Sequence, residues 1–267
     1  MSQQIVRLEE SLGSKLFDRL GRGVRLTESG QTLLPQALEI LRQVNGARTK
    51  LEALRQDVGG RLVIGCIPTI TPYFLAEKLK DFARQYPEVD VRLTEEITPN
   101  LVSLAQGGEL DIAVISPPVN NPDIVCSDLF REPILVAVGS DHRLAKEARI
   151  CLPHLAEEKL LLLKEGHCFR NNALRLCQGA RVNFVSVFES NQLSSILSMV
   201  AAGFGISLVP RMAAVPHEGC MFLPLERESY RRIGYMRARR HALGSAQKAF
   251  IGWLRAIARN QGRPLNV

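Results

Sequence analysis

Apolar residues near the start of the chain recur at steps of three and four, the spacing of one face of an α-helix. This pattern predicts a helix over residues 2–11, which ends at Gly13. The segment 21–26 (GRGVRL) is typical of a tight turn in a short two-stranded ribbon. Thr27 follows it and can begin the next helix, because a threonine hydroxyl caps helix starts well.

The next apolar stripe is much longer. Residues 33–54 carry apolar side chains at three- and four-residue steps, namely Leu34, Ala37, Ile40, Leu41, Val44, Ala47, Leu51 and Leu54. A helix of this length with a single apolar stripe usually pairs with a helix of another subunit. We therefore expect this segment to be a dimerisation helix.

After Gly59 and Gly60 the pattern changes to short apolar runs that alternate with helical stretches. The predicted strands are 62–65, 89–95, 111–115, 134–138, 160–163, 184–187 and 206–209, and the predicted helices are 72–85, 101–106, 168–178, 190–202 and 245–258. This alternation is typical of a twisted, largely parallel sheet with covering helices. The pattern restarts after Arg131, so we predict two α/β lobes.

The composition narrows the class of protein. The chain has 267 residues, of which 46% are hydrophobic and 23% charged, as in globular proteins with room for two domains. It contains no apolar run of the roughly 18 residues that a membrane span needs, and its first residues are polar and charged. We therefore expect a cytoplasmic protein without a membrane partner.

The net charge of +7 invites a nucleic-acid interpretation, but its distribution weakens that argument. Residues 225–267 contain 10 Lys or Arg and only two Asp or Glu. The excess positive charge thus lies mostly at the C-terminal end and does not by itself indicate a DNA-binding head.

Six cysteines occur in the chain, and in a cytoplasmic protein they should be mostly reduced thiols. The sequence has no CxxC pair and no Cys/His cluster at zinc spacing. We expect neither a metal nor another cofactor.

Two segments near the N-terminus resemble a known family. Residues 4–19 (QIVRLEESLGSKLFDR) and 26–30 (LTESG) resemble the second half of the winged helix-turn-helix of LysR-type transcriptional regulators, and residues 201–206 (AAGFGI) fit the same family further on. The resemblance covers essentially the whole chain. It implies an α/β fold with a partial winged helix-turn-helix (1–30), a linker dimerisation helix (31–58) and a two-lobed, Rossmann-like effector domain of the type II periplasmic-binding-protein kind (59–267).

Family members begin with two further helices, so the resemblance implies an N-terminally truncated chain that binds promoter DNA weakly. In a helix-turn-helix, the recognition helix contacts bases and the wing contacts phosphates. By this resemblance the DNA-contacting residues would be Ser2, Gln3 and Arg7 on the helix and Lys15, Arg19, Arg22 and Arg25 beside the wing. For each single residue, an ordinary solvated side chain is an equally good interpretation.

Within the family, residues 166–170 (GHCFR), with Cys177 nine positions after Cys168, resemble the peroxide-sensing OxyR subgroup. The segment from Ile67 to Tyr73 resembles the same subgroup's peroxide pocket. The resemblance implies that Cys168 attacks peroxide and that Cys177 then forms a reversible disulfide with it. It also implies that the peroxide site is lined by Thr69, Thr98 and His167.

The residues around Cys168 fit this role in physical terms. A cysteine at a strand-to-helix junction lies near free backbone N–H groups, and we expect these, with His167, Arg170 and Lys164, to favour the thiolate. If residues 168–177 are helical, the two sulfurs lie on opposite faces, about 13.5 Å apart along the axis. A disulfide requires Cα atoms within about 7 Å, so the helix would have to unwind. The alternative is two independent core cysteines.

Two positions depart from the subgroup's pattern. Asn171 stands where these proteins commonly have an aspartate. An arginine expected in a late strand falls on Ala238 in ungapped counting, so that either Arg237 or Arg239 could supply the positive charge.

These observations predict a peroxide-responsive transcription activator that is not an enzyme. The resemblance implies a homodimer or homotetramer that contacts promoter DNA and RNA polymerase. One alternative is a regulator that senses a small co-inducer in the cleft between the lobes through Thr69, Thr98 and the 203–205 segment. The others are a thiol peroxidase, which would need turnover with a reductant, and a solute-binding protein, which conflicts with the missing export signal.

Overall fold

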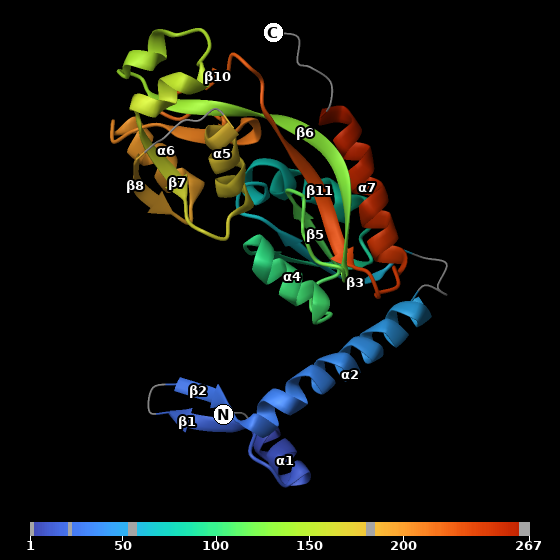
Figure 1. The fold of residues 1–267 in the computed structure, drawn as a ribbon. Helices are drawn as coiled ribbons and strands as arrows, with labels where there is room; N and C mark the ends of the chain where they lie inside the picture. Colours follow the sequence, from blue (N-terminus) through green and yellow to red (C-terminus); the bar gives the residue numbers. More distant parts are fainter. Residues whose placement is uncertain (1–2, 21–22, 53–57, 180–184, 262–267) are drawn as a thin grey trace.

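The structure is a computed structural model that describes residues 3–20, 23–52, 58–179 and 185–261. Its N-terminal part is a small head followed by a long helix, which leads away from the head toward the remainder of the molecule (Figure 1). The head elements are α1 (Gln3–Leu12), β1 (Phe17–Leu20) and β2 (Gly23–Leu26), and the long helix is α2 (Glu28–Glu52).

Side chains of α1 and of the loop before α2 hold the head together. The Glu9 carboxylate accepts hydrogen bonds from the N–H groups of Leu16 (2.7 Å) and Phe17 (3.2 Å). The Thr27 hydroxyl accepts from the Gly30 N–H (3.0 Å), which confirms the predicted start of the second helix. The end of the predicted apolar stripe, beyond residue 52, lies outside the described residues.

Lobe I is the α/β unit that follows. Its elements are β3 (Gly60–Cys66), the π-helical turn η1 (Thr71–Leu75), α3 (Ala76–Gln85), β4 (Val89–Glu95), α4 (Thr98–Gln106) and β5 (Ile112–Ile115). Strand β3 pairs in parallel with both β4 and β5. The last helix, α7 (Ser245–Gln261), covers this lobe, where Phe250 and Trp253 pack on Phe82. The predicted strands and helices of this lobe are confirmed.

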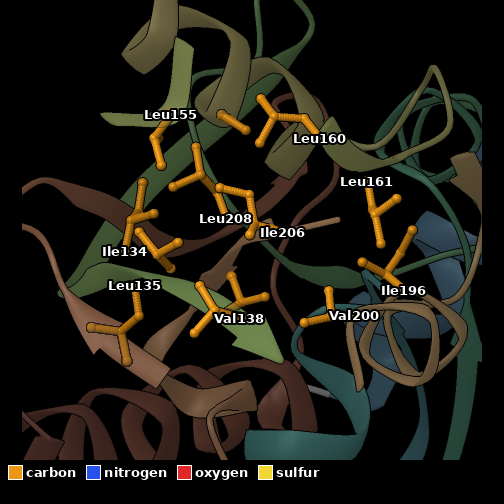
Figure 2. Close-up of a cluster of buried hydrophobic side chains, with 14 of the residues drawn as sticks. Ile134, Leu135, Val138, Leu155, Leu160, Leu161, Ile196, Val200, Ile206 and Leu208 are labelled. Atoms are coloured by element: carbon orange, nitrogen blue, oxygen red, sulfur yellow. The ribbon is translucent and has the colours of Figure 1, made fainter. Parts of the chain in front are cut away.

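Lobe II contains a second hydrophobic core. Its elements are η2 (Arg143–Lys146), η3 (Leu152–Glu157), β7 (Lys159–Leu163), α5 (Cys168–Gly179), β8 (Val185–Ser190), α6 (Leu193–Ala201), β9 (Ser207–Pro210), η4 (Arg211–Ala213) and β10 (Cys220–Pro224). Side chains from β7, α6 and β9 meet at its centre, among them Leu160, Ile196 and Leu208 (Figure 2). Each lobe thus has a core of its own.

Two long strands join the lobes. Strand β6 (Ile124–Gly139) pairs antiparallel with β11 (Tyr230–Ala238) along its first part and with β9 and β10 along its second. The resulting sheet has the order β10-β6-β11-β5-β3-β4, with β9 also paired to β6. The prediction of a largely parallel sheet is therefore wrong, because the antiparallel pairs of β6 and β11 make the sheet mixed.

No helix in the described part of the chain is long and apolar enough to cross a membrane.

Candidate functional site

Cys168 lies at the start of α5, directly after a turn that only glycine fits. Gly166 has φ = +92°, and a Cβ atom there would lie 2.7 Å from Cδ1 of Ile97. This turn brings the chain from the end of β7 into the first turn of α5. The predicted strand-to-helix junction is confirmed, and it places His167 and Cys168 at the boundary between the lobes.

The structure brings together the four side chains that the sequence assigned to peroxide chemistry. Cys168, His167, Thr69 and Thr98 line one narrow pocket. Its remaining wall residues are apolar or conformationally fixed: Ile67, Pro68, Ile97 and Phe169. The pocket encloses about 170 Å³ of atom-free space, and no part of that space is wide enough for a water molecule. A small polar molecule could enter only after a slight movement of the walls.

Two polar atoms of this pocket are buried: Nε2 of His167, which has no hydrogen-bond partner among the described residues, and Oγ1 of Thr98, which has only the Cys168 thiol beside it. Burial lowers the pKa of His167, while a hydrogen bond with Asn191 and the charge of Glu95 act in the opposite direction. The ring is thus favoured in its neutral form. An unsatisfied buried polar atom costs free energy, so its presence here indicates a site for a hydrogen-bonding ligand.

The electrostatic surroundings of Cys168 differ from the sequence prediction. Burial raises the pKa of its thiol, and the positive charge of Arg231 and the nearby Thr98 hydroxyl oppose that effect without cancelling it. Arg170, which we expected to favour the thiolate, instead forms an ion pair with Glu189 at 2.7 Å. Its guanidinium also donates to the carbonyl oxygen of Leu163 (2.9 Å). The cation that acts on Cys168 is therefore Arg231.

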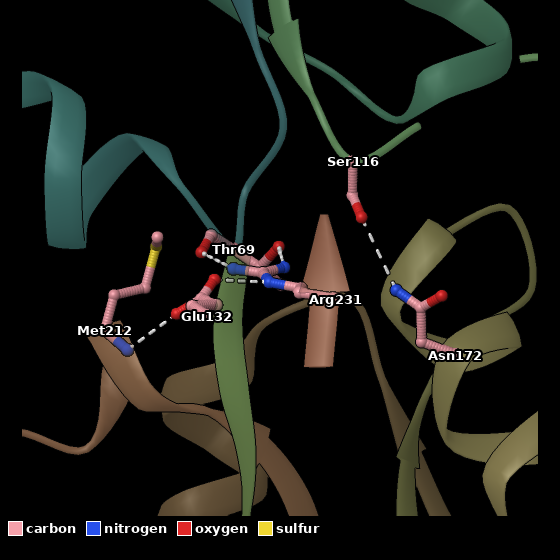
Figure 3. A network of polar contacts seen from close by, with 6 residues as sticks. All are labelled: Thr69, Ser116, Glu132, Asn172, Met212 and Arg231. Atoms are coloured by element: carbon pink, nitrogen blue, oxygen red, sulfur yellow. Dashed lines mark hydrogen bonds and ion pairs between the residues drawn. The ribbon is translucent and has the colours of Figure 1, made fainter. Parts of the chain in front are cut away.

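Arg231 is a fully buried residue of β11 whose guanidinium lies between Thr69 and Glu132 of β6 (Figure 3). Its guanidinium donates to the Thr69 hydroxyl (2.8 Å) and carbonyl (3.1 Å), and it lies over the Phe169 ring at 5.2 Å. Its Nε contacts Oε1 of Glu132 at 2.5 Å, and Oε2 of Glu132 accepts from the Met212 N–H (2.9 Å). A fixed positive charge is thereby held next to the pocket.

Sequence reasoning missed Arg231. The two arginines considered for this role lie elsewhere: Arg237 donates to the carbonyl of Ala238, and Arg239 donates to the carbonyl of Pro122. The alternation of side chains along a strand could have identified it. Arg231 lies two residues before the apolar residue Ile233 and therefore shares one face of β11 with it.

The second cysteine of the predicted pair lies far along the same helix. α5 is helical from Cys168 to Gly179, which confirms the premise that places the two sulfurs on opposite faces, about 13.5 Å apart along the axis. Cys168 packs against the core of lobe I, whereas Cys177 is buried in the core of lobe II. Burial also raises the pKa of Cys177. Both are free thiols.

A wider cleft lies between the lobes, next to the narrow pocket. It is lined from lobe I by Pro68, Pro72, Tyr73, Glu95, Glu96, Ile97 and Asn100, and from lobe II by Glu165, His167, Asn191, Gln192, Leu193 and Ser194. The residues named for a co-inducer site, Thr69, Thr98 and 203–205, are not among the described residues that line it. The first two belong to the narrow pocket instead.

The side chains assigned to DNA contact are exposed where they are described. These are Gln3, Arg7, Lys15 and Arg25. Ser2 and Arg22 lie outside the described residues, as does the side chain of Arg19. Asn171 is exposed on α5, one turn from the pocket, and its carbonyl accepts a hydrogen bond from Arg175 (3.2 Å). Within the described ranges, no group of three or more His, Cys, Asp or Glu residues could hold a metal ion.

Two family models match the chain. Residues 55–259 match the LysR substrate binding domain, and residues 1–31 match the bacterial regulatory helix-turn-helix protein of the lysR family. A hydrogen peroxide-inducible genes activator of Pectobacterium carotovorum is 35% identical over 228 residues, which is 84% of this chain and 75% of that protein. The DNA-binding transcriptional dual regulator OxyR of Escherichia coli K12 is 34% identical over 238 residues, 88% of this chain and 78% of that protein.

Solved structures of similar proteins agree with the predicted fold. A full-length OxyR variant from Pseudomonas aeruginosa has a TM-score of 0.74 at 29% identity, over 96% of this chain and 83% of that chain. The reduced form of OxyR has a TM-score of 0.68 at 31% identity, over 75% of this chain and 97% of that chain. The oxidized form of OxyR has a TM-score of 0.67 at 30% identity, over 76% of this chain and 98% of that chain. The head with a two-lobed α/β domain is thus confirmed.

Proposed function

The chain belongs to the LysR family of bacterial DNA-binding regulators, and we propose that it responds to hydrogen peroxide through oxidation of Cys168. Since the family consists of transcription regulators, the chain is a regulator and not an enzyme, as predicted. The names of its relatives support a peroxide signal. The observation that carries the proposal is the buried His167 Nε2 without a hydrogen-bond partner, in the same pocket as the Thr98 hydroxyl and the Cys168 thiol.

Hydrogen peroxide fits these groups chemically. Each of its oxygens both donates and accepts a hydrogen bond, so the Thr98 hydroxyl and the neutral His167 ring can bond to it. The Thr69 hydroxyl accepts from Arg231 and keeps its own proton free to donate. The Cys168 thiol gives up its proton and attacks one peroxide oxygen as the thiolate, the O–O bond breaks, and the leaving hydroxide takes up that proton to become water. The charge of Arg231 stabilises the negative charge that moves onto the leaving oxygen.

The second step changes the structure. The Cys177 thiol attacks the sulfenic acid of Cys168, which forms the disulfide and releases water; the two thiols thus supply the two electrons that reduce one peroxide. A helix separates the two sulfurs in the reduced state, so α5 has to unwind and Cys177 has to leave the lobe II core. Oxidation therefore selects between two conformations of one segment.

We propose that this rearrangement reaches DNA through the assembly of subunits. Apolar side chains of α2, namely Leu34, Ile40, Leu41 and Val44, are exposed and support pairing of this helix with a second copy, in a dimer or tetramer. The proposed functional divisions remain 1–30 for DNA contact, 31–58 for dimerisation and 59–267 for sensing. In this proposal the exposed polar side chains of the head contact promoter DNA, and the assembled regulator contacts RNA polymerase.

Non-reducing peptide mapping after one equivalent of hydrogen peroxide tests the proposal. The expected result is a Cys168–Cys177 crosslink, preceded in stopped-flow traces by sulfenate formation much faster than that of a free thiol. Cys168→Ser and Cys220→Ser are the target and control variants. An unchanged peptide map, or a rate equal to that of a free thiol, would contradict peroxide sensing and favour a co-inducer in the cleft. Catalytic turnover with a thiol reductant would indicate a peroxidase.

A further inference from the structure

The narrow pocket beside Cys168 and the wide cleft between the lobes share three wall residues, Pro68, Ile97 and His167. The cleft contains about 1200 Å³ of atom-free space, against about 170 Å³ in the pocket. The His167 ring is buried, borders both spaces, and leaves Nε2 without a partner. The cleft is therefore an approach from solvent to the site of the chemistry.

Negative charge lines this approach. Three carboxylates face the cleft: Glu95 at the end of β4, Glu96 beside it, and Glu165 in the turn before α5. The lining includes no lysine or arginine among the described residues, and the described ion pairs involve none of the three carboxylates. Glu96 accepts a hydrogen bond from the uncharged amide of Asn100 (2.9 Å). Within the described residues, none of the three carboxylates is therefore neutralised by an ion pair.

The field of Glu95 extends to the pocket wall. Burial raises the pKa of Tyr73 in the cleft, and the charge of Glu95 adds to that shift; burial lowers the pKa of His167 at the pocket, and the charge of Glu95 opposes that shift. A cleft with one sign of charge and low-dielectric walls concentrates its field and changes the entry rates of charged molecules by about 10- to 1000-fold. This electrostatic effect does not change the entry rate of a neutral molecule.

We propose that Glu95, Glu96 and Glu165 make the sensor selective for neutral hydroperoxides by repelling anionic oxidants before they reach Cys168. This inference rests on the proposed role of Cys168 as the peroxide-reactive thiol. It assigns the three glutamates a role in specificity, and none of them touches the reacting atoms. Hydrogen peroxide is uncharged at neutral pH and passes the carboxylates without repulsion.

A second groove also reaches Cys168, from the side of Ser116 and Asn120, and it contains Arg175 instead of acidic residues. Thr69, Thr98 and His167 do not belong to its described lining. An oxidant that enters there meets the thiol without the groups that we propose to orient the O–O bond. Reaction in the pocket is therefore expected to depend on the acidic cleft, and Arg175 provides a way to detect entry by the other route.

Peroxymonosulfate is a suitable probe, because it has the same reactive O–O bond as hydrogen peroxide but carries a negative charge at neutral pH. With it, the Cys168 thiolate takes the terminal OH oxygen, the O–O bond breaks, and sulfate leaves with the electron pair. The same thiolate attacks in both reactions. The ratio of the two rates therefore cancels any effect of a substitution on the amount of thiolate.

The experiment measures Cys168 oxidation in the full chain by both oxidants, at an ionic strength of about 10 mM, where charges act over about 30 Å. In the triple variant Glu95→Gln, Glu96→Gln, Glu165→Gln, the rate ratio of peroxymonosulfate to hydrogen peroxide should rise about tenfold. A control triple variant at exposed positions, Glu10→Gln, Glu88→Gln, Glu147→Gln, changes the net charge equally and should leave the ratio unchanged. High salt should raise the wild-type ratio toward that of the cleft variant.

Two results would overturn the selectivity while leaving peroxide sensing intact. One is an equal ratio in the two triple variants, with rapid oxidation of the wild type by hydrogen peroxide. The other is a large drop of the peroxymonosulfate rate in Arg175→Gln, which would show that anions arrive through the second groove. If wild-type Cys168 reacts with hydrogen peroxide no faster than a free thiol, the proposed function fails, and the selectivity fails with it.

Discussion

The first residue of α5 lies among polar groups, whereas the residue nine positions later lies in an apolar core. Around Cys168 are the Thr98 hydroxyl, the His167 ring and the guanidinium of Arg231. Cys177, at 1% exposure, is part of the hydrophobic core of lobe II. A polar, charge-bearing site supports nucleophilic attack, while an apolar site keeps the second thiol unreactive until it is released.

The two ends of α5 also belong to different cores. Cys168 packs on lobe I and Cys177 is part of lobe II, so a bond between them rearranges the contacts of a helix that lies between the lobes. Because protein cores are close-packed, they do not follow such a change by small continuous shifts. The difference between the ends thus gives the chain both a reactive thiol and a structural response.

The largest expected effect separates the chemical roles of the two ends. Cys168→Ser should abolish peroxide-dependent sulfenate and disulfide alike, because serine is not a nucleophile toward peroxide under these conditions. Cys177→Ser should keep the sulfenate at an unchanged rate and lose only the disulfide. Stopped-flow trapping of the sulfenate and non-reducing mapping measure both steps. A disulfide between Cys177 and another cysteine in Cys168→Ser would break the comparison.

Removing the charge at the reactive end should destabilise the fold strongly. Arg231→Met leaves the buried carboxylate of Glu132 without its cation, which typically costs about 3–5 kcal/mol. Urea unfolding gives the free energy, and Arg237→Met, whose described hydrogen bonds go to backbone carbonyls, is the control. Adding Glu132→Gln to Arg231→Met should recover part of the loss. A cost below about 1 kcal/mol would mean that the pair is not buried as described.

The two serine variants, Cys168→Ser and Cys177→Ser, should differ in their free energy of unfolding. Position 177 is buried among the apolar side chains of the lobe II core, where a hydroxyl that stays without a hydrogen bond costs about 1–3 kcal/mol. At position 168 the Thr98 hydroxyl is close enough to accept a hydrogen bond, so Cys168→Ser should cost less. Thermal and urea unfolding of the reduced proteins compare the two variants. Equal costs would show that the polarity of the two ends does not differ in the folded state.

The smallest expected effect concerns pH. The pKa of His167 lies below its ordinary value of 6.5 in the folded state, so on acidification the unfolded chain takes up the proton first. The contribution of this residue to stability should be intact above pH 6.5 and should decline as the pH falls below it. His167→Gln should decline less between pH 7.5 and 5.5, whereas His154→Gln at an exposed position should follow the wild type. Identical slopes in all three proteins would contradict a buried neutral ring.

The sequence predicted those parts of the molecule whose pattern is local. The apolar runs of β3, β4, β5 and β7 matched the strands, and the glycine before His167 marked the turn that begins α5. It failed for β11 and for the first half of β6, because these strands carry charged residues such as Arg231 and Glu132 at buried positions. A charged residue at an inward position interrupts the apolar alternation by which a strand is recognised.

By itself, the sequence determined that Cys168 stands at a helix start and that a regular helix holds Cys177 on the opposite face. These features follow from periodicity and from the fixed geometry of an α-helix. Only the tertiary structure decided which cation acts on Cys168, that Nε2 of His167 is buried without a hydrogen-bond partner, and that three carboxylates line the approach. Electrostatic effects depend on the distance between groups and on their burial. In this site both are set by contacts between residues that lie more than 60 positions apart in the chain.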